Sequence, residues 1–143
     1  MTARQTVEDE AGNRLLLLKK SAESSLVRDP ATGETEYRPT ASLEPVDEPP
    51  LRTAARSLPP ELRTLLSAVP DERALGLLLE LDADGPLAVR TLLSAYDLCE
   101  SDLHGLLAEF RAAGLLAETT IAGERGYETT PAASDALAVL RNR

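Results

Sequence analysis

The most regular feature of the chain is an apolar spacing of i, i+3, i+4 and i+7 that recurs four times after residue 60. Side chains at this spacing share one face of an α-helix, so each set predicts an amphipathic helix with one buried stripe. Residues 72–81 are apolar on nearly all sides and predict a central buried helix, which residues 82–86 end. The four stripes are Leu62, Leu65, Leu66, Val69; Val89, Leu92, Leu93, Tyr96; Leu103, Leu106, Leu107, Phe110; and Ala133, Ala136, Leu137, Leu140.

The first fifty residues have a pattern typical of strands. Residues 14–20, 25–29 and 34–39 predict three strands, and the Pro-Ala-Thr-Gly run between the last two predicts a turn. We therefore expect a flexible N-terminus over residues 1–11 and a small antiparallel β-meander over residues 12–43. The acidic, proline-rich residues 44–50 predict a linker. Residues 51–143 then form a helical domain with leading helices, and the predicted fold class is α+β.

A β-hairpin is expected before the last helix. Gly114 can adopt the left-handed conformation with which helices end, and residues 117–121 and 127–130 are rich in strand-forming residues. Residues 122–126 predict the tight turn between these strands, with Arg125 at its tip. Pro131 suits the first turn of the final helix.

The run from Arg73 to Leu140 resembles the winged helix-turn-helix domain of archaeal and bacterial transcription regulators of the arsenic-repressor and multiple-antibiotic-resistance type. The similarity covers about half of the chain and rests on the order of its segments. These are a buried helix, a Gly-Pro turn and short strand, a second helix, a capped helix that closes on Ala113-Gly114-Leu115, a hairpin, and a helix that starts at Thr130-Pro131. The whole chain also resembles small, poorly characterised proteins of halophilic archaea.

This resemblance implies a DNA-binding transcription regulator. Its recognition helix, beginning near Glu100, would enter the major groove of double-stranded DNA, and a basic residue of the wing would enter the minor groove. Such regulators often form homodimers through flanking helices, for which residues 51–66 and 133–140 are candidates. The candidate DNA-binding residues are Arg90, Ser101, Asp102, His104, Gly105, Ala108, Arg111 and Arg125.

The residue types on the recognition helix fit DNA poorly. A helix that reads the major groove uses Arg or Lys for guanine and Asn or Gln for adenine, whereas this face carries small residues, one His and carboxylates. Residues 87–130 contain three Arg against seven acidic residues. An alternative function is therefore a winged-helix protein-interaction adaptor without sequence-specific DNA binding. Both hypotheses remain open at this point.

Composition bears on the partners and the compartment. The 24 acidic and 15 basic residues give a formal net charge of −9, and only Lys19 and Lys20 are lysines. Such a composition is similar to that of proteins from salt-loving archaea, where molar salt screens charges over about 3 Å. No apolar run approaches the roughly 18 residues needed to span a bilayer, and the N-terminus lacks an apolar signal core. We expect a soluble cytoplasmic protein with no membrane partner.

Catalysis and metal binding are not expected. The sequence contains no phosphate-binding glycine loop, nucleophile elbow or zinc-binding helix motif. Cys99 and His104 alone are too few ligands for a metal, so neither catalytic residues nor cofactors are predicted. Cys99 is expected to be a small buried hydrophobic residue. The carboxylate clusters at residues 8–10 and 47–48 are expected to be solvated.

Overall fold

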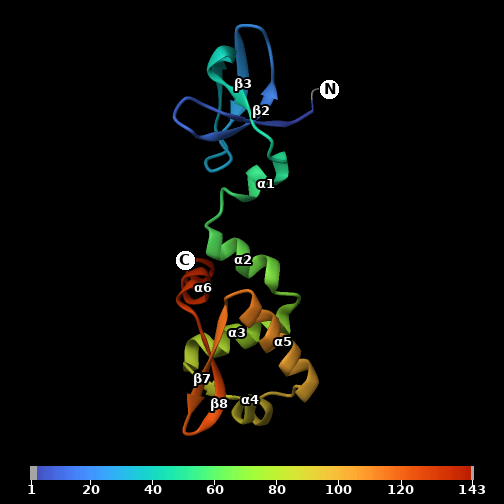
Figure 1. The fold of residues 1–143 in the computed structure, drawn as a ribbon, viewed down its shortest axis with the longest axis vertical. Helices are drawn as coiled ribbons and strands as arrows, with labels where there is room; N and C mark the ends of the chain where they lie inside the picture. The colour runs from blue at the N-terminus through green and yellow to red at the C-terminus, as the bar shows by residue number, and fades with distance from the viewer. Residues whose placement is uncertain (1–2, 143) are drawn as a thin grey trace. The chain divides into compact units, whose positions relative to one another are not determined.

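The computed structural model describes residues 3–142. The chain divides into two compact units between Pro59 and Pro60, and each unit is described by itself. The chain contains helices and two antiparallel sheets, which confirms the predicted α+β class (Figure 1). Among the described residues, no helix is long and apolar enough to cross a membrane.

The first unit is built on a five-stranded antiparallel sheet with the strand order β4-β3-β2-β1-β5. The fifth strand follows a 3-10 turn and returns to pair with the first strand. The elements are β1 (Gln5–Glu8), β2 (Arg14–Lys19), β3 (Ser24–Arg28), β4 (Thr35–Pro39), η1 (Thr40–Ser42), β5 (Glu44–Pro45) and α1 (Pro50–Ala55).

Strand β2 is buried on both of its faces. Leu15 and Leu17 point into the core of the unit, where they cluster with Val7 and Val27. Leu16 points the other way and is still only 4% exposed, because α1 packs on β1 and β2. Three consecutive leucines in one strand are thereby all removed from water.

Glu48 links α1 to this sheet. Its side chain is 5% exposed, and its carboxylate lies 2.9 Å from an Nη of Arg14 on β2 and 2.7 Å from Nε of Arg56. The Thr53 hydroxyl donates a hydrogen bond to the same carboxylate at 2.8 Å and lies 2.6 Å from the Thr6 hydroxyl of β1. The hydrogen bond from Arg14 is the main cause that holds the pKa of Glu48 below its ordinary value. The residues before α1 are thus fixed by a buried polar network.

The predicted boundaries in this half of the chain are wrong in three places. Residues 1–11, predicted to be flexible, contain β1. Residues 44–50, predicted to be a linker, contain β5 and the buried Glu48. The division lies at Pro59, so α1 belongs to the first unit and not to the domain predicted over residues 51–143. Both segments are polar, and pairing with distant strands, which no local pattern reports, gives them their structure.

The predicted solvation of the carboxylate clusters is also wrong for two of their members. Glu48 is one, and Asp9 is the other, with 8% of the residue exposed. Asp9 accepts hydrogen bonds from the backbone N–H groups of Ala11 and Asn13 and lies 3.1 Å from an Nη of Arg38. Burial is tolerated because every carboxylate oxygen of Asp9 has a donor.

The second unit contains helices in the predicted order, with a hairpin before the last one. A short strand joins that hairpin in a three-stranded sheet of order β6-β8-β7. The elements are α2 (Pro60–Ala68), α3 (Glu72–Asp84), β6 (Leu87–Ala88), α4 (Val89–Ala95), α5 (Glu100–Ala112), β7 (Leu116–Ile121), β8 (Glu124–Thr129) and α6 (Pro131–Arg141).

The ends of these helices follow from local chemistry. The Asp71 side chain caps α3 by accepting from the Ala74 N–H at 2.9 Å, and the Thr130 hydroxyl caps α6 by accepting from the Ala133 N–H at 3.3 Å. Gly114 has φ +79° directly after α5, and the Leu115 N–H returns to the Phe110 carbonyl at 2.9 Å. This closure turns the chain from α5 into β7.

The inner faces of the predicted stripes meet in one apolar core. Leu66 and Leu140, which the spacing assigned to these stripes, instead remain 54% and 49% exposed on α2 and α6, two helices that pack against each other. The most deeply buried side chains are Leu65, Leu78, Leu81, Leu92, Leu103, Leu107, Phe110, Leu115 and Leu137.

Replacing Glu48 by Gln should lower the Tm at neutral pH, because it leaves Arg14 and Arg56 without their carboxylate. The pKa of Glu48 is lower in the folded chain than in the unfolded one. Its stabilisation is therefore complete above the ordinary value of 4.5 and is lost as the pH falls through the folded-state pKa. Thermal melts followed by circular dichroism, from neutral pH to about pH 3, should show that the Tm difference between the wild type and Glu48→Gln shrinks as the pH falls. The exposed Glu44→Gln serves as control, and a difference independent of pH would contradict this role.

Candidate nucleic-acid interface

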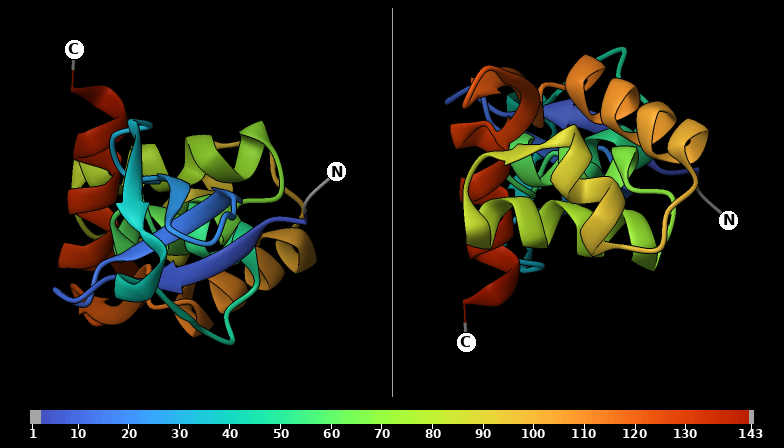
Figure 2. Two further views of the ribbon diagram at one scale, coloured as in Figure 1. Left: turned by 90° about the horizontal axis from the view of Figure 1, so that it is seen from above. Right: turned by 90° about the horizontal axis from the view of Figure 1, so that it is seen from below.

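Helix α5 presents one face to the core and the other to solvent. Leu103, Leu107 and Phe110 are fully buried. The opposite face is exposed, as the spacing predicted, and lies on the other side of the unit from α6 (Figures 1 and 2). The exposed residues of this face include Ser101, Asp102, His104, Gly105 and Ala108.

The N-terminus of α5 differs from its prediction at Cys99. This residue is the N-cap of the helix, forms no capping hydrogen bond, and is exposed where a buried side chain was expected. Its Sγ lies 3.1 Å from the Ser101 hydroxyl, and this hydrogen bond is the largest cause that lowers the pKa of the thiol. Cys99 has an extended backbone conformation before the first helical residue, Glu100, so the helical spacing of the α5 stripe does not apply to it.

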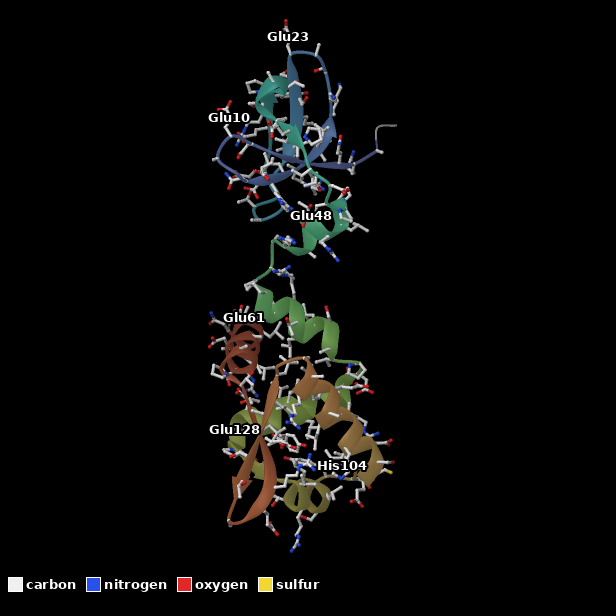
Figure 3. All side chains as sticks on the ribbon, viewed as in Figure 1. Glu10, Glu23, Glu48, Glu61, His104 and Glu128 are labelled. Carbon is white, nitrogen blue, oxygen red and sulfur yellow. The ribbon has the colours of Figure 1, made fainter. Side chains whose placement is uncertain are left out.

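His104 is the one histidine of the chain, and it stands on the open face of α5 (Figure 3). Its Nε2 lies 3.7 Å from a carboxylate oxygen of Glu100, one helical turn earlier. No cluster of three or more His, Cys, Asp or Glu side chains suited to a metal ion occurs between residues 3 and 142. The imidazole is exposed, and its ion-pair partner among the described residues is Glu100.

Arg111 and Arg125 converge on one carboxylate, that of Glu118 in β7. Arg111, near the end of α5, lies 3.1 Å from Oε1 of Glu118, and Arg125, on β8, donates a hydrogen bond to the same oxygen. Tyr127 completes the group, because its hydroxyl accepts from Arg125 at 2.8 Å and lies 3.2 Å from Glu118. The hydrogen bond from Arg125 is the main cause that lowers the pKa of Glu118.

Arg90, the third predicted basic contact, is also paired. It opens α4 with its side chain 85% exposed, and one Nη lies 3.4 Å from a carboxylate oxygen of Glu124 in β8. All three arginines of residues 87–130 thus face a carboxylate of the hairpin. Exposed pairs of this kind contribute little to stability, so a stronger anion could displace the carboxylate.

The turn of the hairpin is shorter than predicted. Ala122 and Gly123 alone connect β7 to β8, with φ values of +51° and +81°, as a two-residue turn with positive φ at both positions requires. Arg125 therefore does not lie at the tip: it pairs with Thr120 inside the ribbon. The predicted turn of residues 122–126 is wrong because Gly126 belongs to β8, where it allows the close approach of β6.

Sequence reasoning missed the hub role of Glu118 and Tyr127. These residues are direct cross-strand partners in the ribbon, so their side chains lie on one face. A turn placed at Ala122-Gly123 would have revealed that pairing from the sequence. The contact with Arg111 could not be found in this way, because it depends on how α5 packs against β7.

The charge of the second unit opposes a polyanion. Residues 60–143 contain seven Arg and fourteen acidic residues, whereas residues 1–59 contain eight of the basic residues and ten acidic ones. The candidate surface thus has three paired arginines in a unit whose acidic residues outnumber its basic ones. Phosphate affinity depends on cations, so binding of DNA would need the ion pairs to open.

A family model matches residues 4–141, and its description is a family of unknown function, DUF7346. The chain belongs to this family. No curated protein matches it.

Solved structures of HlyU are similar to part of the chain. The transcriptional regulator HlyU from Vibrio vulnificus CMCP6 is 28% identical, with 54% of this chain and 80% of that chain covered and a TM-score of 0.47. HlyU from Vibrio cholerae N16961 is 29% identical, with 58% of this chain and 94% of that chain covered and a TM-score of 0.47. Its reduced form gives the same identity and TM-score, with 90% of that chain covered.

Replacing Gly126 by Ala should destabilise the second unit by about 1–3 kcal/mol, the usual penalty of overpacking. An added Cβ would lie 2.6 Å from the Leu87 carbonyl oxygen and 2.5 Å from a methyl group of Ile121. Backbone cannot yield as a flexible side chain can, so the pairing of β6 with β8 must shift. Gly105→Ala is the control, because a Cβ added there would meet nothing within 4 Å. This substitution should stabilise α5 by about 0.5–1 kcal/mol. Urea unfolding measures the free energy of unfolding of both variants. If Gly126→Ala were as stable as Gly105→Ala, the close approach of Leu87 to Gly126 would be refuted.

Proposed function

We propose that the second unit is a winged helix-turn-helix module and that the protein is a DNA-binding transcription regulator. The observation that carries the proposal is the open face of α5, presented beside the β7–β8 ribbon after helices in the order of that module. In this function α5 lies in the major groove and the ribbon on the flanking backbone. The relation to the arsenic-repressor and multiple-antibiotic-resistance type, the order of a β-rich first unit before the module, and a salt-adapted cytoplasmic setting are parts of the same proposal.

Each candidate residue has a role in this proposal. Arg90, Arg111 and Arg125 contact phosphates after exchanging Glu124 and Glu118 for them. Ser101 and His104, near the start of α5, offer hydrogen bonds to base edges. Gly105 and Ala108 have small side chains in the middle of α5, so that the major groove of DNA can approach the helix backbone closely. Asp102 contributes negative charge near the N-terminus of α5, where the helix dipole favours it.

Glu118 acts as a competitor of DNA phosphate in this proposal, which makes its charge the sharpest test. Glu118→Gln should raise the affinity for duplex DNA about two- to fivefold, because it releases two arginines from a surface ion pair. It should also steepen the dependence of affinity on salt, since more phosphates are neutralised. Fluorescence anisotropy with a pool of random duplexes of about 30 base pairs, over a KCl series, measures both quantities.

Glu128→Gln is the matched control, because it removes the same charge from β8 at a residue without an ion pair in the described chain. An equal gain in both variants would mean that only net charge matters. Arg111→Ala combined with Arg125→Ala should abolish the gain, because these are the two arginines that Glu118 holds. Failure of the wild-type protein to bind any duplex, even at low salt, would overturn DNA binding.

The alternative function, a winged-helix protein-interaction adaptor, is favoured by one observation. The three arginines suited to phosphate are already paired with carboxylates, in a unit with twice as many acidic as basic residues. Such a surface repels nucleic acid and attracts cationic proteins. The DNA titration decides between the two functions.

We also propose that the regulator is a homodimer formed through α2 and α6. These helices pack against each other and leave Leu66, Val139 and Leu140 each about half exposed, an apolar surface that a second copy would cover. Replacing Leu66 and Leu140 by Ser should convert dimers to monomers in sedimentation equilibrium. Leu51→Ser, at the 86% exposed leucine of α1, is the control and should leave the mass unchanged. A monomeric wild-type protein would refute the dimer.

A further inference from the structure

Two adjoining hollows lie between α3 and the segment that runs from Tyr96 into α5. The first has a volume of about 260 Å³ and a mostly apolar lining that includes Gly76, Leu77 and Tyr96. The second has a volume of about 300 Å³ and a mostly polar lining that includes Ser101, Asp102 and Gly105. Arg73 and Leu98 line both hollows, so the two adjoin along these residues and are together called the α3–α5 groove.

Each of the two helices that line the α3–α5 groove has a glycine there, so no side chain projects into the groove at that position. Gly76 lies within α3 and Gly105 within α5, where glycine destabilises a helix by about 0.5–1 kcal/mol relative to alanine. Neither has a positive φ, and a Cβ added at either would meet nothing within 4 Å. Packing inside the unit therefore does not require these glycines. A molecule that approaches the two helices closely would require them.

The lining of the groove is rich in acidic residues that have no ion-pair partner in the part of the chain that the structure describes. Asp71, Glu80, Asp97, Asp102 and Glu109 line the groove, and among the described residues none of these carboxylates forms an ion pair. Their one basic neighbour in the lining, Arg73, donates to the Asp97 carbonyl at 3.2 Å. By contrast, Glu48, Glu118 and Glu124 each have an arginine within 4 Å. Arg73 is thus the single basic residue in a lining with five carboxylates, and it forms no ion pair among the described residues.

We propose that the α3–α5 groove docks a cationic amphipathic segment of another protein. An apolar side chain of that segment fills the first hollow against Leu77 and Leu98, and a Lys or Arg lies over the second hollow between Asp102 and Glu109. Charge complementarity selects this occupant, because five carboxylates around an apolar floor attract a basic segment and repel phosphate or an acidic peptide. The groove shares Ser101, Asp102 and Gly105 with the face of α5 proposed to contact DNA, so a docked segment and DNA would compete there. The arginines proposed for DNA phosphates lie outside the groove, because they pair with the β7–β8 ribbon.

The apolar hollow can be filled without damaging the fold. A Cβ added at Gly76 meets nothing within 4 Å, and leucine is a better helix former than glycine. The Tm of Gly76→Leu should therefore equal or exceed that of the wild type. Its affinity for a dye-labelled, 14-residue peptide of Lys and Leu at helical spacing should fall roughly tenfold, the loss typical of one buried anchor. Fluorescence anisotropy measures the affinity. Ala138→Leu, on an exposed position of α6, is the matched control and should bind like the wild type.

The acidic rim is tested in the same assay. Glu109→Lys should weaken binding well beyond Asp135→Lys, which makes the same change of charge on α6. A peptide with Glu in place of Lys should not bind. Equal losses in Gly76→Leu and Ala138→Leu, equal losses in the two Lys variants, or binding of the Glu peptide would each overturn the proposal. So would self-association of the wild type that Gly76→Leu removes, because the occupant would then be a second copy.

Discussion

Removal of the α5 leucines from water is the constraint on which the second unit depends. Leu103, Leu107 and Phe110 are fully buried, and burial of such side chains contributes about 1.5–3 kcal/mol each. Because 3.6 residues make a turn, fixing these three positions also fixes which residues of α5 face outward. The open face, the groove beside α3 and the contact of Arg111 with the ribbon are all consequences of this one rotation of the helix about its axis.

Electrostatics then divides the surroundings of α5 into two surfaces of different character. On the ribbon side, Glu118 and Glu124 pair with all three arginines of residues 87–130. On the α3 side, five carboxylates and a single arginine, Arg73, line the groove, and none of these carboxylates forms an ion pair among the described residues. One helix thus separates a surface of paired arginines from a surface of unpaired carboxylates.

Much of the second unit could be predicted from the sequence, because its information is local. The apolar stripes, the caps at Asp71 and Thr130, and the glycine after α5 each act within a few residues. The first unit was harder, because β1, β5 and the site of Glu48 are formed by pairing between distant polar segments. The exposure of α5 residues could be predicted, because it follows from the local helical spacing. The partners of Arg90, Arg111 and Arg125 could not, because those ion pairs depend on a hairpin register that is displaced by a two-residue turn.

The junction at Pro59-Pro60 has a mechanical consequence. Two successive prolines lack the amide hydrogens that a continuous helix needs, so α1 cannot extend into α2 as a rigid rod. The units, each with its own core, are therefore coupled as tethered neighbours. Whatever the first unit binds raises the effective concentration of the second near that partner.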